Sequence, residues 1–119
     1  MLYVVIPVYN RWHYTKACLE ALRKQTFRAF RTVVVDDGST DGTAGRLAEA
    51  FPEVTVLLGS GNLYWTAAVN LGIAHALAGG ADRVVTLNND TLPPPDFLVQ
   101  MHGQSLAHPN ALLGPLELD

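Results

Sequence analysis

This sequence has few cysteines, no run of basic residues and few charged residues overall, and each of these absences excludes a class of protein or site. Cys18 is the only cysteine among the 119 residues, so neither an internal disulfide nor a cysteine-based zinc site is possible, and we expect a reducing, cytoplasmic setting. Lys and Arg number 8 against 11 for Asp and Glu, which gives a net charge of −3. A chain with that balance and no basic run is a poor candidate for nonspecific nucleic-acid binding.

Long hydrophobic runs are also missing. No apolar run approaches the roughly 20 residues that a membrane-spanning helix needs. The first ten residues carry neither the basic segment nor the small-residue cleavage site of a signal peptide, so we interpret them as a strand. Disorder is excluded because 49% of the residues are hydrophobic, and the length fits one compact domain.

Four short apolar runs, rich in valine and isoleucine, are nearly continuous in hydrophobicity. This is typical of strands buried on both faces of a parallel sheet. The runs cover residues 2–8, 32–35, 54–58 and 83–87, and residues 111–113 are a candidate fifth strand.

Segments with helical character lie between these runs, over residues 15–25, 41–51, 66–78 and 95–106. Either Ser39 or Thr40 can cap the second segment. The third is apolar on nearly every side, so we expect a buried helix. The alternation predicts an α/β fold with an open, mostly parallel sheet and helices on both faces.

Polar residues gather where three of the predicted strands end, at residues 7–10, 36–41 and 88–91. In a parallel sheet these ends share one edge, which is where open α/β sheets bind ligands. The adjacent carboxylates of Asp36 and Asp37 fit a tight turn and a ligand site about equally well.

Residues 88–90 are either a loop of turn formers or a site for Mg²⁺ or Mn²⁺. Asp90 is a single carboxylate, so a nucleotide diphosphate would have to complete such a site. The four histidines show no metal-ligand spacing. Tyr9, Tyr64 and Trp65 are able to stack on a base or sugar, although such aromatic residues more often pack.

With these clusters in place, the chain resembles the family 2 glycosyltransferases, whose nucleotide-sugar-binding fold is called GT-A. The matching segments occur in the family's order over nearly the whole chain. The run 62–65 before residues 70–73 is most similar to the rhamnosyltransferase-like branch. The matching positions are residues 5–10, 25–27, 34–43, Asn62, 68–73 and 87–91.

The resemblance implies a nucleotide-binding site and a metal site. Asp36, in preference to Asp37, would accept the pyrimidine N–H, and Asn62 and Asn70 would lie near the sugar or ribose. Asp90 matches the last carboxylate of the family's DxD metal motif for Mn²⁺ or Mg²⁺, with Asn88 at its first position. The implied nucleotide-binding residues are Pro7, Tyr9, Asn10, Asp36, Asp37, Asn62 and Asn70.

The resemblance also implies a reaction: metal-assisted transfer, with inversion, of a sugar from a UDP- or dTDP-linked donor to a hydroxyl of a saccharide or lipid-linked acceptor, as in cell-surface polysaccharide biosynthesis. Family members are usually much longer, and their second half supplies the acceptor surface and the catalytic base. Residues 1–119 are therefore expected to be a single, partial donor-binding domain, with the base outside it. An open sheet edge would favour pairing with another copy, and the full-length protein would lie in the cytoplasm, peripheral to the membrane.

Two alternatives stay open. A catalytically inactive nucleotide-binding or interaction module is favoured by the short length and by Asn88. A nucleotidyltransferase of similar fold is disfavoured, because no glycine-rich, lysine-bearing loop lies near the N-terminus to hold a triphosphate.

Overall fold

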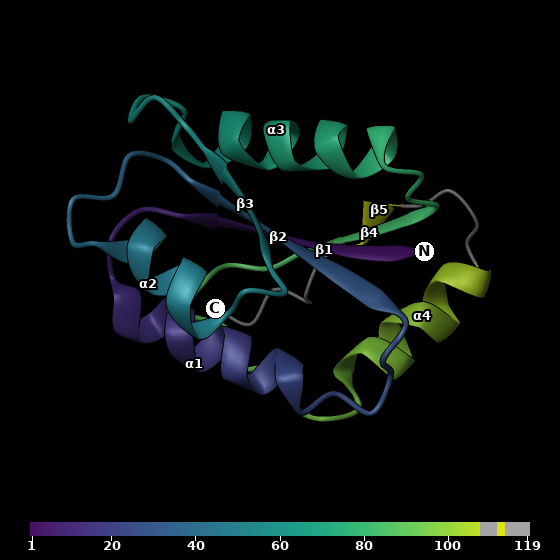
Figure 1. Ribbon diagram of the computed structural model, residues 1–119. Coiled ribbons are helices and arrows are strands. Elements are labelled where there is room, and N and C mark those ends of the chain that lie inside the picture. Colours follow the sequence, from purple (N-terminus) through teal and green to yellow (C-terminus); the bar gives the residue numbers. More distant parts are fainter. Residues whose placement is uncertain (108–111, 114–119) are drawn as a thin grey trace.

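A computed structural model describes the backbone of residues 1–107 and 112–113 and the side chains up to residue 103. Strands and helices alternate along the chain, as the sequence predicts (Figure 1). The elements are β1 (Leu2–Val8), α1 (Trp12–Arg23), β2 (Phe30–Asp36), α2 (Thr43–Ala50), β3 (Thr55–Leu58), α3 (Tyr64–Ala78), β4 (Arg83–Thr86), α4 (Phe97–Ala107) and β5 (Leu112–Leu113).

The strands form one sheet in the order β3-β2-β1-β4-β5, and every neighbouring pair is parallel. In the centre, Val5 of β1 pairs with Val33 of β2 and Thr86 of β4. The predicted α/β fold is therefore confirmed, and the fifth strand exists at two of its three expected residues. Residue 111 lies outside the described residues. β3 and β5 are the edge strands of this sheet. The expected pairing of an edge strand with a second copy of the chain stays a prediction.

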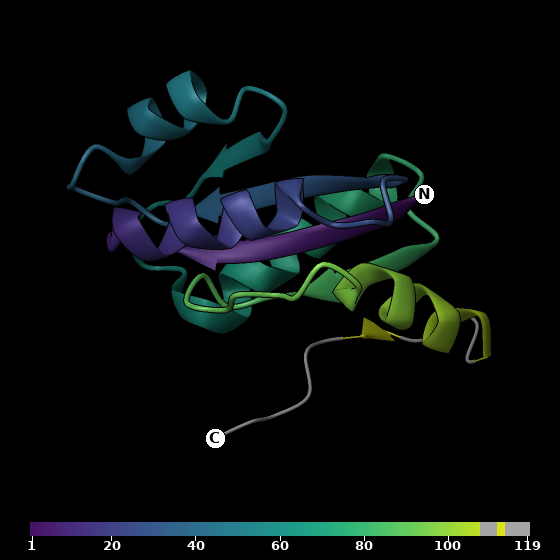
Figure 2. The same cartoon turned by 90° about the horizontal axis from the view of Figure 1, so that it is seen from below.

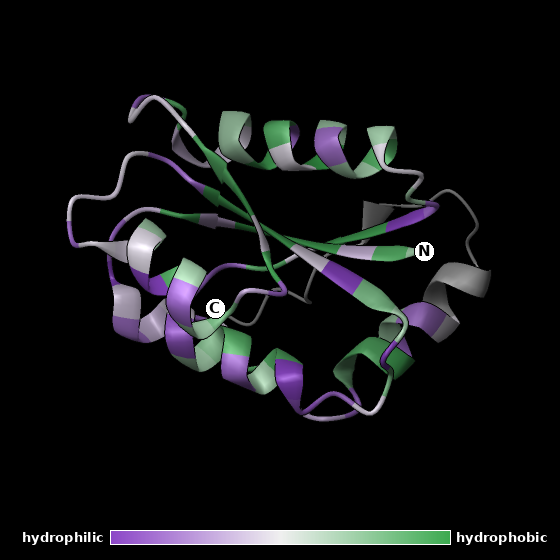
Figure 3. Ribbon diagram, viewed as in Figure 1, coloured by the Kyte–Doolittle hydropathy of each residue, from purple (hydrophilic) through white to green (hydrophobic). Residues whose placement is uncertain are grey.

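In the part of the chain that the structure describes, α1, α2 and α4 cover one face of the sheet, and α3 alone covers the other (Figures 1 and 2). Even-numbered side chains of β1 point to the first face, and Figure 3 shows how hydrophobic the central strands are. The largest buried side chains on that face include Ile6, Leu19, Leu47, Phe51 and Leu98.

The α3 face is thinner. Tyr3, Val5, Val33 and Val35 of the sheet pack there against small residues of α3. A Cβ atom on Gly72 would lie 2.4 Å from Cγ1 of Val5, so the helix approaches the sheet closely at that glycine.

The expectation of a fully buried third helix is wrong for its outer face. Trp65, Leu71 and Leu77 of α3 are 54%, 40% and 60% exposed. The reason is geometric: in the described part of the chain no other helix covers this face, so α3 buries only the side turned to the sheet. Within the same part, no helix has the length and hydropathy needed to span a membrane.

Several helix ends differ from those expected. Thr43 begins α2 and the N-cap position is Gly42, not Ser39 or Thr40; the N–H and hydroxyl of Thr43 both donate to Asp41, the residue before Gly42. The start of α4 at Phe97 is fixed by Gln25, which lies two residues after the end of α1. The Leu98 N–H donates to Oε1 of Gln25 at 2.9 Å.

Candidate functional site

The loops that follow β1 and β2 are joined side by side at the carboxyl edge of the sheet. The Asn10 N–H donates to Oγ of Ser39, and the Thr40 N–H donates to Oδ1 of Asn10, both at 2.7 Å. The Trp12 N–H donates to Oδ2 of Asp41 at 3.2 Å. Asn10, expected to contact a nucleotide, thus has its side-chain oxygen engaged in holding the two loops together.

The two adjacent aspartates are both buried, and their hydrogen bonds differ. Asp36 accepts the Ser39 N–H on Oδ1 at 3.1 Å. Asp37 accepts three backbone N–H groups from the segment that starts α3: those of Gly61 at 2.8 Å, Leu63 at 3.0 Å and Tyr64 at 2.9 Å. Its carboxylate satisfies donors that the first turn of a helix leaves unpaired and lies at the positive end of the helix dipole.

These contacts also act on the ionisation of Asp37. Burial by itself raises the pKa of the carboxyl, but the N–H groups of Tyr64, Gly61 and Leu63 outweigh it and hold the pKa below its usual value. Asp37 therefore remains an anion near neutral pH. The sequence fits a tight turn and a ligand site equally well at this position. The structure shows that Asp37 has a structural role, and its contact with a nucleotide stays a prediction.

Backbone strain is concentrated at the same edge. Asn10, Arg11 and Tyr64 have φ angles of 56°, 56° and 59°, in the left-handed region that residues other than glycine rarely adopt. Gly38 has a φ of 78°, and a Cβ atom there would lie 2.8 Å from Cα of Gly61. Such strain persists where the surrounding structure enforces it, and it is common at binding sites.

A pocket of about 520 Å³ opens between these loops. That volume is within the range typical of small-molecule sites. Aromatic rings, one guanidinium and polar backbone surround it. Its lining residues are Pro7, Val8, Tyr9, Arg11, Asp37, Gly61, Tyr64, Trp65, Ala68 and Asn89.

The loop after β4 borders the pocket and is held from two sides. The Trp65 indole N–H donates to Oδ1 of Asn88 at 2.9 Å, and Nδ2 of Asn89 donates to Oγ1 of Thr15 at 3.1 Å. Asp90 is exposed, and its carboxylate accepts no hydrogen bond from the described residues.

The donor set of this loop limits what ion it can hold. Among the described residues, no group of three or more His, Cys, Asp or Glu side chains could hold a metal. Asp90 supplies one carboxylate, and the oxygen of Asn88 is engaged by Trp65. Mg²⁺ and Mn²⁺ are often bound by one or two carboxylates together with substrate phosphates, so these residues fit a divalent ion only in combination with a diphosphate.

The structure gathers some of the predicted site residues and not others. Pro7, Tyr9 and Asp37 line the pocket. Asn62 and Asn70 are exposed and do not line it. Sequence reasoning missed Arg11, whose position next to the 7–10 cluster and positive charge were the available signals.

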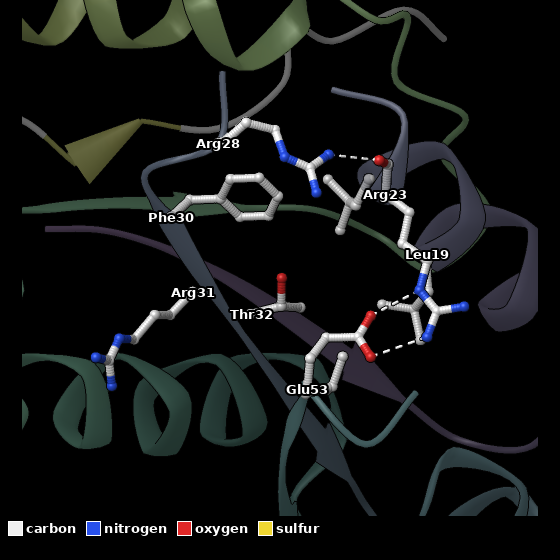
Figure 4. A pocket seen from close by; sticks show the side chains of 9 residues that line it. Leu19, Arg23, Arg28, Phe30, Arg31, Thr32 and Glu53 are labelled. Carbon is white, nitrogen blue, oxygen red and sulfur yellow. Dashed lines mark hydrogen bonds and ion pairs between the residues drawn. The ribbon is translucent and has the colours of Figure 1, made fainter. Parts of the chain in front are cut away.

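A second cavity, of about 180 Å³, lies at the other end of β2 and does not form an anion site (Figure 4). Arg23 is paired with Glu53 at 2.7 Å, and Arg28 donates to the carbonyl oxygen of Arg23. Figure 4 shows the Arg31 guanidinium pointing away from the other labelled side chains. The positive charges therefore do not converge.

Comparison with known proteins identifies the family. The family model described as Glycosyl transferase family 2 matches residues 3–114. The succinoglycan biosynthesis protein ExoA of Rhizobium meliloti is 34% identical over 87% of this chain and 32% of its own length. The N-acetylglucosaminyl-diphospho-decaprenol L-rhamnosyltransferase of Mycobacterium tuberculosis is 31% identical over 100% of this chain and 42% of its own.

Solved structures agree in fold. TarS 1–349 of S. aureus in complex with UDP matches 90% of this chain and 32% of its own with a TM-score of 0.74 at 24% identity. The mannosyltransferase PcManGT of Pyrobaculum calidifontis, in complex with GDP-Man and Mn²⁺, matches 78% of this chain and 28% of its own with a TM-score of 0.66 at 29% identity. The chain thus spans less than half of each of these proteins. On the match over residues 3–114, this chain belongs to glycosyl transferase family 2.

Proposed function

We propose that this chain binds the donor of a glycosyltransferase that moves a sugar from a nucleotide-diphosphate sugar to an acceptor hydroxyl. The observation that carries the proposal is the pocket of about 520 Å³ at the carboxyl edge of the sheet. The loops that follow β1, β2 and β4 all contribute residues to it. The complexes of neighbouring structures with UDP and with GDP-Man support it.

The nucleoside would lie between the loops after β1 and β2. Tyr9 is 55% exposed and lines the pocket with Pro7, so its ring is available to stack on a base. Asp36 is buried, does not line the pocket and accepts the Ser39 N–H on Oδ1, so its contact with the N–H of a uracil or thymine ring would use Oδ2 and stays a prediction. Arg11 would donate to the diphosphate, because a guanidinium matches the geometry of phosphate oxygens.

Asp90 would hold a divalent cation, Mn²⁺ or Mg²⁺, on the diphosphate. Such an ion supplies charge neutralisation as a nucleoside diphosphate departs. The exposed carboxylate of Asp90 has no competing hydrogen bond from the described residues. The Mn²⁺ in the PcManGT complex supports the use of a divalent ion.

The rest of the reaction would depend on residues beyond the described ones. Transfer with inversion needs a base that deprotonates the acceptor hydroxyl, and none of the pocket residues other than the amide-bound Asp37 is a carboxylate or histidine. The name of the mycobacterial relative supports a lipid-linked acceptor, which would place the full-length protein at the cytoplasmic face of a membrane.

A catalytically inactive binding module is the second candidate. It is favoured by the single carboxylate in the loop at residues 88–90, because the DxD motif that this loop resembles has two. The two candidates share the donor site and differ in turnover. Sugar transfer by the full-length protein, abolished by Asp90→Ala, would support the enzyme, and binding without turnover would support the module.

A thermal-shift titration with UDP, dTDP and GDP, each with and without Mn²⁺, tests the donor site. A nucleotide at a hundred times its Kd stabilises the folded state by about 2.7 kcal/mol. We expect a Mn²⁺-dependent shift that Asp90→Ala removes and Glu49→Ala, an exposed carboxylate on α2, retains. No shift with any nucleotide would contradict the proposal.

A further inference from the structure

One hydrogen bond joins α3 to the loop that follows β4, and both of these segments line the pocket. The Nε1–H of Trp65, at the start of α3, donates to Oδ1 of Asn88 at 2.9 Å. The two residues are 23 positions apart, and the indole also lines the pocket. The bond therefore fixes an aromatic wall of the pocket and the motif side chain relative to one another.

The bond also determines what Asn88 offers to a ligand. An asparagine amide has one oxygen that accepts and one NH₂ that donates. The oxygen of Asn88 is engaged by the indole, and its Nδ2 donates to no other described residue. The bond occupies one of the two lone pairs of the oxygen and turns the NH₂ away from the indole, so position 88 has two N–H donors available to a ligand.

The start of α3 is itself held by hydrogen bonds, so the backbone position of Trp65 is fixed. The preceding residue, Tyr64, has a φ of 59°, and its N–H donates to the buried carboxylate of Asp37. Trp65 is 54% exposed, so packing alone does not fix its ring and the bond to Asn88 adds the missing constraint.

We propose that Trp65 is a positioning residue, which holds Asn88 so that its amide NH₂ donates to the diphosphate of the donor and leaves Asp90 as the sole metal ligand of the loop. The proposal rests on the proposed function for the identity of the ligand, but the bond between Trp65 and Asn88 can be tested without one. It predicts that restoring the family's carboxylate at position 88 harms binding, because aspartate cannot donate and would repel the diphosphate.

The first experiment is an NMR spectrum of the ligand-free chain labelled with ¹⁵N. The chain has two tryptophans, so its spectrum holds two indole N–H signals, and Trp65→Phe identifies that of Trp65. We expect Asn88→Ala to shift the Trp65 signal and to speed its exchange with water. The signal of Trp12, whose ring packs against Phe51, serves as the internal control and should not move. A Trp65 signal that is insensitive to Asn88→Ala would overturn the proposal.

The second experiment measures UDP affinity by calorimetry, in EDTA and in Mn²⁺, for a double-mutant cycle. Losing a hydrogen bond to a charged group weakens binding about tenfold, which is the change expected for Asn88→Ala. We expect Trp65→Phe, which keeps an aromatic ring, to weaken binding about threefold when Asn88 is present and to have no effect in the Asn88→Ala background. Trp12→Phe is the matched control and should bind like the wild type.

The Asn88→Asp variant separates the two roles of position 88. A donor role predicts weaker UDP binding than in the wild type both in EDTA and in Mn²⁺. Tighter binding in Mn²⁺ would make position 88 a metal ligand and overturn the proposal, as would additive effects of Trp65→Phe and Asn88→Ala. A wild-type chain that binds no nucleotide would contradict the proposed function and the phosphate contact together, while the NMR result would still decide whether Trp65 holds Asn88.

Discussion

Two polar loops border the same pocket and use their carboxylates in opposite ways. The loop after β2 buries Asp37, and three backbone N–H groups bind its oxygens. The loop after β4 leaves Asp90 exposed, with no hydrogen bond from the described residues. Both carboxylates follow a buried strand, and neither the sequence pattern nor the position at the sheet edge distinguishes them.

The two carboxylates differ in that one stabilises the structure of the site and the other is available to bind a ligand. Amide hydrogen bonds stabilise the charged form of a buried carboxylate, and the carboxylate in turn satisfies the backbone N–H groups. Such a carboxylate has little capacity left to bind a ligand. An exposed carboxylate contributes little to stability and remains available to a cation. The first loop therefore holds the pocket together, and we assign ligand chemistry mainly to the second.

Removing the buried carboxylate should produce the largest effect. Asp37→Ala leaves the N–H groups of Gly61, Leu63 and Tyr64 without their acceptor at the start of α3. Hydrogen bonds to a charged group contribute about 1.5–3 kcal/mol each, and part of this is recovered by water, so we expect a loss of about 3 kcal/mol. Urea unfolding measures it.

The matched control for that experiment is Asp90→Ala, the same change in the exposed loop. A surface substitution of this kind alters stability by less than about 0.5 kcal/mol. If the two variants lost equal stability, the distinction between the two loops would be wrong.

The fold follows from the sequence because its signals are local and redundant. Residues 2–8 are apolar throughout, and β1 has those bounds. Helix ends were less predictable, since α1 begins at Trp12 after Arg11, a residue in the left-handed conformation that carries no capping signal. The exposed outer face of α3 escaped prediction because hydropathy does not reveal which neighbour covers a helix.

The site was predictable in position but not in its internal contacts. Strand ends brought Pro7, Tyr9 and Asp37 to one pocket as expected. The roles of Asp37 and Asn88 depend on partners about 25 residues away in sequence, at the start of α3. No periodicity or spacing records such a pairing, so only the assembled structure separates Asp37 from Asp36.

A smaller effect is expected from crowding the first loop at its glycine. Gly38→Ala places a Cβ atom 2.8 Å from Cα of Gly61 and forces alanine to a φ of 78°. Overpacking and left-handed strain together should cost about 2 kcal/mol. Gly45→Ala is the control in α2: a Cβ there meets no atom within 4 Å, and alanine should stabilise the helix by about 0.5–1 kcal/mol. Equal changes in the two variants would show that the loop is not tightly packed.

The smallest effect expected is a change in acid stability. The folded pKa of Asp37 lies below its ordinary value of 3.8, because the amide hydrogen bonds outweigh burial. Its contribution to stability is therefore fully present above about pH 4 and is lost as the pH falls through the lower folded value, when the unfolded chain binds the proton first. Urea unfolding between pH 5 and pH 2, on the wild type and on Asp37→Asn, should show a shallower acid decline in the variant, by at most about one proton. Asp90→Asn removes the same charge from the exposed loop and controls for net charge. Parallel declines in the wild type and Asp37→Asn would mean that the amides at the start of α3 do not hold this carboxylate in its charged form.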